Sequence, residues 1–417
     1  MKDDKQTTLA ATENLRFPEE IDVVFRDGER KQTVTYRQVK WTLNGRDFGL
    51  RHGENPGRPA ALYKPVGGQF TLGEIDLVRT AGPTVSEPEL LAPCHCPGKI
   101  GIRDIDIALS ALRYTLHRPT CVIVKHNNPC GAAMANHPDQ AFQLAVRANR
   151  SAAVGACATF NRPVDLPTAE AILQVPLDIL VAPDFEEGVL GMLARRPDLC
   201  LMRVGKLDQL AQDIGRPHLA LTSLSDGGLI AEMTVSPPAL SRENYRPSSA
   251  LQHKTQEVRG KRQPTPGEWE DMLFAWVIAA TTASDSVVYV KDCATVGIGI
   301  GGQDRTAVAQ IARDYAYHNM ADRLAWERFH VPYDAVTDET MRESIWADAA
   351  ELKGGLIGAG MASDGALNHP GPLEVALREG VTAVIQPGGS AYDAELIRLC
   401  NARNVVMVFT GERAFRH

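Results

Sequence analysis

The stretch Thr120–Gly131, TCVIVKHNNPCG, runs from an apolar strand into a basic pair and then into a turn. Residues 285–297, DSVVYVKDCATVG, repeat the order of apolar strand, lysine and polar residue. This echo, although it is one short match, suggests a duplicated unit. On both sides of each stretch, short β-branched runs alternate with helical patterns. Such alternation predicts an α/β fold in which helices cover a sheet.

The pattern divides the chain into three parts. Residues 1–45 read as a polar leader with one hairpin that turns at Asp27–Gly28, 46–215 as a first α/β unit, and 216–417 as a second unit. The second unit contains a proline-rich connection and a helical insertion at about 321–350. Strands are expected at 120–124, 153–160, 178–182, 199–204, 285–291, 294–300, 381–386 and 405–410, and the segment 98–106 also reads as strand-like. Helices are expected from Pro138 onward and at 186–196, 268–282, 304–320 and 391–403.

Composition narrows the class of protein. The 417 residues are 44% hydrophobic and 23% charged, which is typical of a globular protein, and the net charge of −7 argues against a nucleic-acid surface. The polar N-terminus does not resemble a signal peptide, and no segment has the roughly 18 apolar residues of a membrane span. Eight scattered cysteines do not describe a disulfide scaffold. We therefore expect a reduced, cytoplasmic protein without a membrane or nucleic-acid partner.

The sharpest chemical signal is Lys125-His126 at the end of the apolar strand. In open α/β sheets ligands bind at the carboxyl ends of strands. Lysine supplies positive charge there, and histidine supplies a base that titrates near neutral pH. An exposed loop with incidental basic residues fits the same local features equally well.

Other motifs are weaker. The glycine loops 387–390 and 299–302 each lie between a strand and a helix, where backbone N–H groups can bind an anion, but tight packing of strand on helix is the favoured reading. The sequence Cys94-His95-Cys96 lacks a second cysteine pair at zinc-ligand spacing, so we expect no metal site. The tail Arg413–His417 has an aromatic residue between arginines, which suits a planar base that carries a phosphate. Solvated disorder is the alternative for such a tail.

Together these stretches resemble a known family. Seven stretches are similar to the formyltransferase half of the bifunctional purine enzyme. They are LRHGENPGRPAALY (50–63), IVKHNNPCGAA (123–133), VAPDFEEGVL (181–190), KRQPTPGEWEDMLFAW (261–276), TVGIGIGGQDR (295–305), VTAVIQPGGS (381–390) and VMVFTGERAFRH (406–417). That family joins aminoimidazole carboxamide ribonucleotide (AICAR) formyltransferase to IMP cyclohydrolase. The similar stretches occur in the family's order and cover nearly the whole chain beyond residue 45.

The resemblance implies two tandem cytidine-deaminase-like three-layer units without the deaminase zinc. It also implies a homodimer with shared active sites, and formyl transfer from 10-formyltetrahydrofolate to AICAR without a metal. Lys125 and His126 match the catalytic pair. Substrate-binding positions are Arg51, His52, Gly53, Gly155, Asp178, Asp285, Arg413, Phe415 and His417. Co-substrate positions are Gln303, Asp304, Thr306, Ala366 and Asn368. The similar stretches fall outside the cyclohydrolase half, so a separate IMP cyclohydrolase is the expected partner in the pathway.

The chain departs from the family at several positions. His52 replaces a tyrosine, and Asp285 replaces an asparagine and so adds a charge beside the expected nucleotide. The family's aromatic run is replaced by Gly365–Gly371, GALNHPG. Two alternatives therefore stay open: a paralogue that binds a purine-pathway nucleotide without transferring a formyl group, and a formyltransferase with a different donor.

Overall fold

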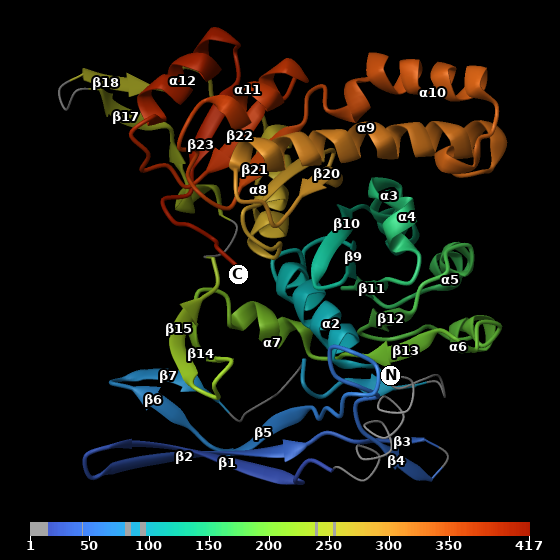
Figure 1. Ribbon diagram of the computed structural model, residues 1–417, viewed down its shortest axis with the longest axis vertical. Coiled ribbons are helices and arrows are strands. Elements are labelled where there is room, and N and C mark those ends of the chain that lie inside the picture. Colours follow the sequence, from blue (N-terminus) through green and yellow to red (C-terminus); the bar gives the residue numbers. More distant parts are fainter. Residues whose placement is uncertain (1–15, 44, 80–84, 92–96, 238–240, 253–255) are drawn as a thin grey trace, which may run out of the picture.

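The computed structural model describes residues 16–43, 45–79, 85–91, 97–237, 241–252 and 256–417. Within them, twelve strands form one large sheet of mixed direction (Figure 1). From one edge to the centre the strands are β8 (Glu89–Leu90), β13 (Cys200–Arg203), β12 (Ile179–Ala182), β11 (Cys157–Phe160), β9 (Thr120–Lys125) and β10 (Asn128–Met134). From the centre to the other edge they are β20 (Ala294–Gly299), β19 (Val287–Lys291), β21 (Gly360–Ser363), β22 (Ala383–Gln386), β23 (Val406–Phe409) and β16 (Arg246–Pro247). The expected α/β fold is confirmed.

The strand order reads the same from both edges of this sheet. Each half has a central antiparallel hairpin, β9–β10 or β19–β20, followed by three strands that run parallel to one another and a short antiparallel edge strand. The halves meet where β10 pairs with β20, and the N–H of Met134 donates to the carbonyl of Cys293 at 2.9 Å. The repeat suggested by two short stretches is therefore a repeat of the whole strand order.

Helices cover both faces of the sheet and give three layers. On one face α2 (Lys99–Leu112) and α8 (Pro266–Ala280) share a core with both halves. On the other face lie α3 (Pro138–Ala148), α5 (Leu166–Leu173) and α6 (Val189–Leu193) in the first half, and α9 (Arg305–Phe329), α11 (Gly371–Arg378) and α12 (Asp393–Ala402) in the second half. Strand β9 shows why both faces need a cover. Val122 and Val124 face the core under α2 and α8, whereas Cys121 and Ile123 face the core under α3, α5 and α6. This alternation follows from the two-residue period of a strand.

Three local expectations were wrong. Residues 99–106 belong to helix α2, because Ile102, Ile105 and Leu109 recur at helical spacing and are all buried. Ala153 ends the short helix α4 (Arg150–Ala153), which Asn149 caps by accepting from the N–H of Ala152, so the expected strand 153–160 begins only at Cys157. The loop expected after residue 124 is a tight turn that leads into β10.

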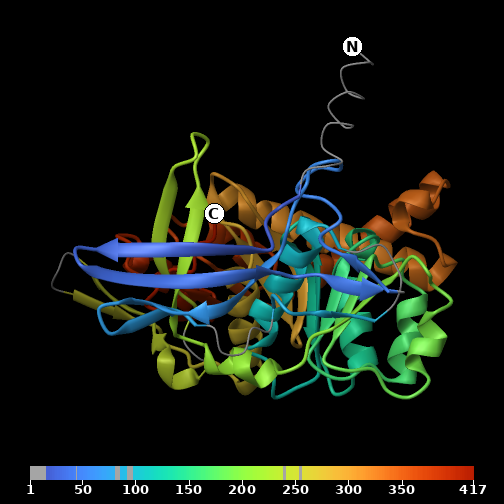
Figure 2. The same ribbon diagram turned by 90° about the horizontal axis from the view of Figure 1, so that it is seen from below.

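Smaller elements surround the large sheet. Strands β1 (Glu20–Asp27), β2 (Arg30–Gln38) and β5 (Tyr63–Gly68) form a separate sheet that extends across the molecule in Figure 2. The connection between the halves contains the hairpins β14–β15 (Pro217–Ser223 and Leu229–Val235) and β17–β18 (Ser249–Gln252 and Gln256–Arg259). Helix α9 continues unbroken past residue 321, and α10 (Glu339–Glu351) packs against it. None of the helices in the described ranges is long and apolar enough to cross a bilayer.

Candidate functional site

Lys125 and His126 lie at the tip of the central hairpin of the first half. Lys125 pairs with Asn128, so the turn consists of His126 and Asn127 alone. Both turn residues have left-handed φ angles, 53° and 64°, the combination that a type I′ hairpin turn requires. Lys125 is half-buried and His126 is exposed, so the turn presents the imidazole at the surface.

A buried carboxylate lies beneath this turn. Asp104 on α2 is only 6% exposed and accepts a hydrogen bond from the backbone N–H of Asn127 at 2.7 Å. Burial raises the pKa of Asp104 to about 6, although the backbone amides of the turn and the nearby His126 and Arg103 act in the opposite direction. The turn therefore rests on a group that changes its charge close to neutral pH.

The ammonium group of Lys125 is held by the turn between α4 and β11. Its Nζ donates to the carbonyl of Val154 at 2.6 Å. The next residue, Gly155, has a φ of 72°, and a Cβ at that position would lie 3.7 Å from Oδ1 of Asp178. The structure thus brings three sequence-predicted residues, Lys125, Gly155 and Asp178, to one end of strands β9, β11 and β12.

A cavity of about 270 Å³ opens beside the pair, between the two halves. Lys125, His126 and Asn128 line it from the hairpin, and Asn149 lines it from the end of α3. The second half contributes side chains from β20, α9 and the loop between them: Ile298, Ile300, Tyr315 and Asn319. The basic pair therefore lines a partly open cavity between the two halves.

The C-terminal tail is fixed against the same hairpin. The guanidinium group of Arg416 donates to the carbonyls of Asn127 at 3.0 Å and Thr281 at 3.1 Å. Figure 1 shows the tail ending near α2 in the middle of the molecule. Arg413 and Phe415 line a different cavity, of about 420 Å³, together with Arg103 and Arg113 of α2, and the linings of the two cavities share no residue in the described part of the chain. The rings of Phe415 and His417 lie 5.8 Å apart. The tail thus contacts the hairpin through Arg416, whereas Arg413 and Phe415 face a cavity other than that of the basic pair.

The charge of Asp285 is paired within the protein. Arg305 donates to Asp285 at 2.6 Å and to the fully buried Asp364 at 3.1 Å. Arg305 also reaches the carbonyl of Ala366 at 3.4 Å. The charge that replaces the family's asparagine is therefore compensated by a neighbouring arginine.

The expected co-substrate residues lie around the start of α9. The carboxylate of Asp304 caps the helix by accepting from the N–H groups of Thr306 and Ala307, as the sequence predicts. Ala366 is buried, and Gln303 and Asn368 are exposed. Oδ1 of Asp304 lies 3.7 Å from Nε2 of His369, which follows Asn368. These residues thus form a second cluster, which Arg305 joins to Asp285.

Arg51, His52 and Gly53 lie at the start of α2. The N–H of Lys99 donates to the carbonyl of His52 at 2.9 Å, and the N–H of Arg51 donates to the carbonyl of Pro97 at 3.1 Å. Lys99 precedes Asp104 by five residues, roughly 7.5 Å along a helix axis. Arg51 lines neither the cavity beside Lys125 nor the cavity beside Arg413.

The weaker motifs have structural roles. In the loop 387–390, the amides of Gly389 and Ser390 donate to Asp393 of their own helix, so an internal carboxylate fills the anion position. A Cβ on Gly299 would lie 2.2 Å from the carbonyl oxygen of Val308, which shows close packing of strand on helix. Cys94-His95-Cys96 lies outside the described residues. In the described part of the chain, no group of three or more histidine, cysteine or acidic side chains is placed to hold a metal.

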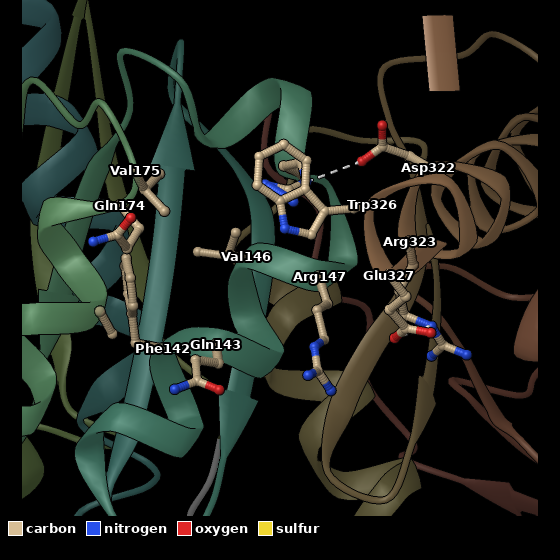
Figure 3. Close-up of a pocket in the computed structure, with 12 residues that line it drawn as sticks. Phe142, Gln143, Val146, Arg147, Gln174, Val175, Asp322, Arg323, Trp326 and Glu327 are labelled. Carbon is tan, nitrogen blue, oxygen red and sulfur yellow. Dashed lines mark ion pairs between the residues drawn. The ribbon is translucent and has the colours of Figure 1, made fainter. Parts of the chain in front are cut away.

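A further cavity, of about 250 Å³, lies away from the basic pair, between α3 and α5 on one side and α9 on the other. Apolar and charged side chains line it together, and Figure 3 shows the indole of Trp326 lying over the first half with Asp322 beside it. This cavity marks a contact between the two halves.

Sequence reasoning missed Asp104, Arg305 and Arg416. Arg305 and Arg416 lie within stretches that carry the family resemblance, but nothing in the local sequence marks a guanidinium group whose partner is far away in the chain. Asp104 had a possible signal, since it is an acidic residue amid the apolar positions of a helix. Reading that segment as strand-like hid the signal.

Comparison with known proteins agrees with this arrangement. A family model described as AICARFT/IMPCHase bienzyme matches residues 10–315. The chain is 33% identical over 375 residues, 89% of its length, to the bifunctional purine biosynthesis protein PurH of Chlorobaculum parvum, and covers 59% of that protein. It is 30% identical over 403 residues, 96% of its length, to the PurH protein of Persephonella marina, and covers 62% of it. The chain thus spans about three fifths of the length of these relatives. It belongs to the AICARFT/IMPCHase bienzyme family.

Proposed function

We propose that this chain transfers a formyl group from 10-formyltetrahydrofolate to the 5-amine of AICAR. The observation that carries the proposal is the Lys125–His126 pair, fixed at a hairpin tip and lining a cavity between the two halves. Membership of a family whose relatives are named as bifunctional purine biosynthesis proteins supports it. The proposed setting is the cytoplasm.

In the proposed reaction His126 removes a proton from the 5-amine as its nitrogen attacks the formyl carbon. The 5-amine is conjugated with an electron-withdrawing ring and needs such a base. Lys125 stabilises the tetrahedral oxyanion or protonates the departing folate nitrogen. The new bond joins the amine nitrogen to the formyl carbon, the bond from that carbon to the folate nitrogen breaks, and the folate nitrogen gains a proton. Assistance by the carboxamide of the substrate is the alternative route for the first proton.

The proposed roles of the other residues follow their places. Arg413 and Arg51 are assigned to the nucleotide phosphate, Gly155, Asp178 and Phe415 to other nucleotide contacts, and the Gln303–Thr306 and Ala366–Asn368 segments to the folate. Arg51 is absent from the lining of both the Lys125 and the Arg413 cavities. We therefore propose a homodimer in which Arg51 serves the partner's site, and light scattering should report the mass of two chains.

The test is an assay of the purified chain with AICAR and 10-formyltetrahydrofolate. We expect turnover, and losses on the order of 100-fold or more in kcat for His126→Ala and for Lys125→Ala. Arg403→Ala, which removes an exposed charge at the end of α12, should retain activity. We also expect the formylated nucleotide to accumulate without IMP until a separate IMP cyclohydrolase is added.

A second function is favoured by one observation, the replacement of the family's aromatic run by Gly365–Gly371. Here a Cβ on Gly365 would lie 2.3 Å from Nη2 of Arg305 and 2.6 Å from Cε1 of Phe415, so protein groups press against this segment. A chain that binds AICAR but shows no turnover with any folate donor would be a nucleotide-binding paralogue. Turnover with a different formyl donor would assign the altered pocket to that donor.

A further inference from the structure

The carboxylate under the central hairpin carries an inference about how the basic pair is positioned. We propose that Asp104 is a positioning residue for the proposed formyl transfer, because its buried carboxylate holds the His126–Asn127 turn and thereby orients Lys125 and His126. The inference rests on the proposed function for its kinetic part, whereas its structural part does not depend on turnover.

Asp104 holds an N–H of the turn, whereas Arg416 and Asn128 hold its carbonyls. Both turn residues are left-handed, and His126 has a branched ring side chain rather than the glycine that such turns favour. The backbone N–H of Asn127 points inward to Oδ1 of Asp104 at 2.7 Å. Without the Asp104 carboxylate, the N–H of Asn127 would lose its hydrogen-bond acceptor. A buried N–H without an acceptor lowers the free energy of unfolding. Asp104 thus compensates for an unfavourable turn.

The charges around Asp104 come from several elements. The groups that face it among the described residues are Arg103 on its own helix, His126 on the turn, Cys130 on β10, Cys157 on β11 and Arg416 on the tail. Burial raises the pKa of Cys130 to about 12 and that of Cys157 still further, so both thiols are neutral. Arg103, Arg416 and His126 are the basic groups among them. Burial outweighs their attraction, because the pKa of the Asp104 carboxyl is raised overall. Asp104 is therefore a desolvated carboxyl group directly behind the proposed catalytic base.

The second half contains the same arrangement of a buried aspartate under a hairpin turn, but without the basic pair. Asp271 on α8 is 7% exposed and accepts from the backbone N–H groups of Asp292 at 3.1 Å and Cys293 at 2.7 Å. Those two turn residues also have left-handed φ angles, 51° and 59°. The turn follows Lys291 as the other follows Lys125, but it has Asp292 where the first half has His126. Asp271 is therefore a matched control whose loss disturbs an equivalent turn remote from the proposed chemistry.

The experiment compares the full wild-type chain with Asp104→Asn and Asp271→Asn. Each substitution keeps the shape of the side chain, replaces the charged acceptor by a weaker neutral amide oxygen, and turns the second carboxylate oxygen into an NH2 donor. We expect kcat of Asp104→Asn to fall about tenfold or more, with both KM values within about threefold of wild type, because the substrate contacts are intact and the reacting groups are misplaced. Asp271→Asn should keep kcat within about twofold of wild type.

A pH profile separates positioning from a general loss of stability. Asp104 takes up a proton near pH 6, so wild-type kcat should fall on the acid side as the carboxylate is neutralised. Asp104→Asn should lack that component and show low kcat across the range. The proposal is overturned if Asp104→Asn retains wild-type kcat, or if Asp271→Asn loses as much as Asp104→Asn.

Amide hydrogen exchange tests the hold on the turn without turnover. Exchange of the peptide that contains Asn127 should speed up in Asp104→Asn and not in Asp271→Asn, and the peptide that contains Cys293 should behave in the opposite way. If the wild-type chain proves inactive, the proposed function is wrong. Hydrogen exchange then tests by itself whether Asp104 holds the turn. Unchanged exchange at Asn127 would overturn the proposal in either case.

Discussion

Asp271, like Asp104, is a residue whose burial costs stability at neutral pH. Burial raises its pKa from 3.8 to about 6. A carboxyl with a raised pKa in the folded state contributes stability that is fully present below pH 3.8 and is lost as the pH rises through 6. A shift of this size corresponds to about 3 kcal/mol. Asp271→Asn has no such titration, so its unfolding free energy relative to wild type should rise by up to about 3 kcal/mol from pH 4 to pH 7.

Chemical denaturation of both proteins at several pH values measures this difference. Asp271→Asn also weakens the acceptor for two amides, so the variant is expected to be less stable than wild type at the acid end. The informative quantity is the slope with pH. A constant difference between the two proteins across the range would mean that Asp271 titrates as it does in the unfolded chain.

At the same scale, the sequence identifies residues whose role depends on their neighbours in the chain. Lys125 and His126 were found because they follow a buried strand. Arg416 was not, because its partner Asn127 lies 289 residues away in the chain. The sequence predicts that Asp285 adds a charge beside the nucleotide, since only the folded chain brings Arg305 to it.

At the scale of elements, the C-terminal tail is the clearest case of order that depends on tertiary contacts. Besides the contacts of the Arg416 guanidinium, its backbone exchanges two hydrogen bonds with Ser284, and the N–H of Ala414 donates to the carbonyl of Asp364 at 2.9 Å. Ordered contacts, rather than solvated disorder, therefore describe this tail. Its anchoring keeps Arg413 and Phe415 at the cavity that they line with α2.

Arg416→Ala should release the tail. Two hydrogen bonds from a charged donor would be lost, and we expect KM for AICAR to rise about tenfold with a smaller change in kcat, because the proposed nucleotide contacts become mobile. Steady-state kinetics measures this, and Arg403→Ala controls for the loss of one positive charge. An unchanged KM would show that the tail is held without Arg416.

Most strands and helices follow from apolar periodicity, and the failures have a common cause. In residues 98–106, Ile100 and Ile102 fit a two-residue period, and only the continuation through Ile105, Leu109 and Leu112 reveals the helical face. The sequence Asn128–Met134 contains proline and glycine and reads as a loop. It forms β10 because β9 and β20 flank it in the sheet, and such pairing is not a local property.

At the scale of the whole molecule, the two halves are joined along a narrow strip. Strands β10 and β20 pair at Ala133 and Ala294, and the hydroxyl of Thr295 both accepts from the N–H of Ala132 at 2.9 Å and donates to its carbonyl at 3.2 Å. The echo of two short stretches predicts the repetition but not how the repeats associate. The cavity beside Lys125 and His126 lies between the same two halves, at the opposite end of β10 and β20, so its geometry depends on keeping the halves in register.

A second contact between the halves lies farther from the sheet. The guanidinium group of Arg150, at the start of α4, lies 3.3 Å from the ring centroid of Trp326 and 3.3 Å from a carboxylate oxygen of Asp322 on α9. Asp322 is buried and also accepts from the N–H of Tyr333 at 2.9 Å. This cluster borders the cavity of Figure 3. It joins the first half to the long helix of the second half.

Arg150→Met should lower the unfolding free energy by about 2 to 3 kcal/mol, because it leaves the buried Asp322 without its counter-charge. Adding Asp322→Asn should restore part of that loss, with a coupling energy of about 1 to 2 kcal/mol in a double-mutant cycle by urea denaturation. The control is Arg323→Met, which breaks an exposed pair with Glu327 on the same helix and should cost less than about 1 kcal/mol. Equal losses for Arg150→Met and Arg323→Met, or additive effects in the cycle, would show that the cluster does not hold the halves together.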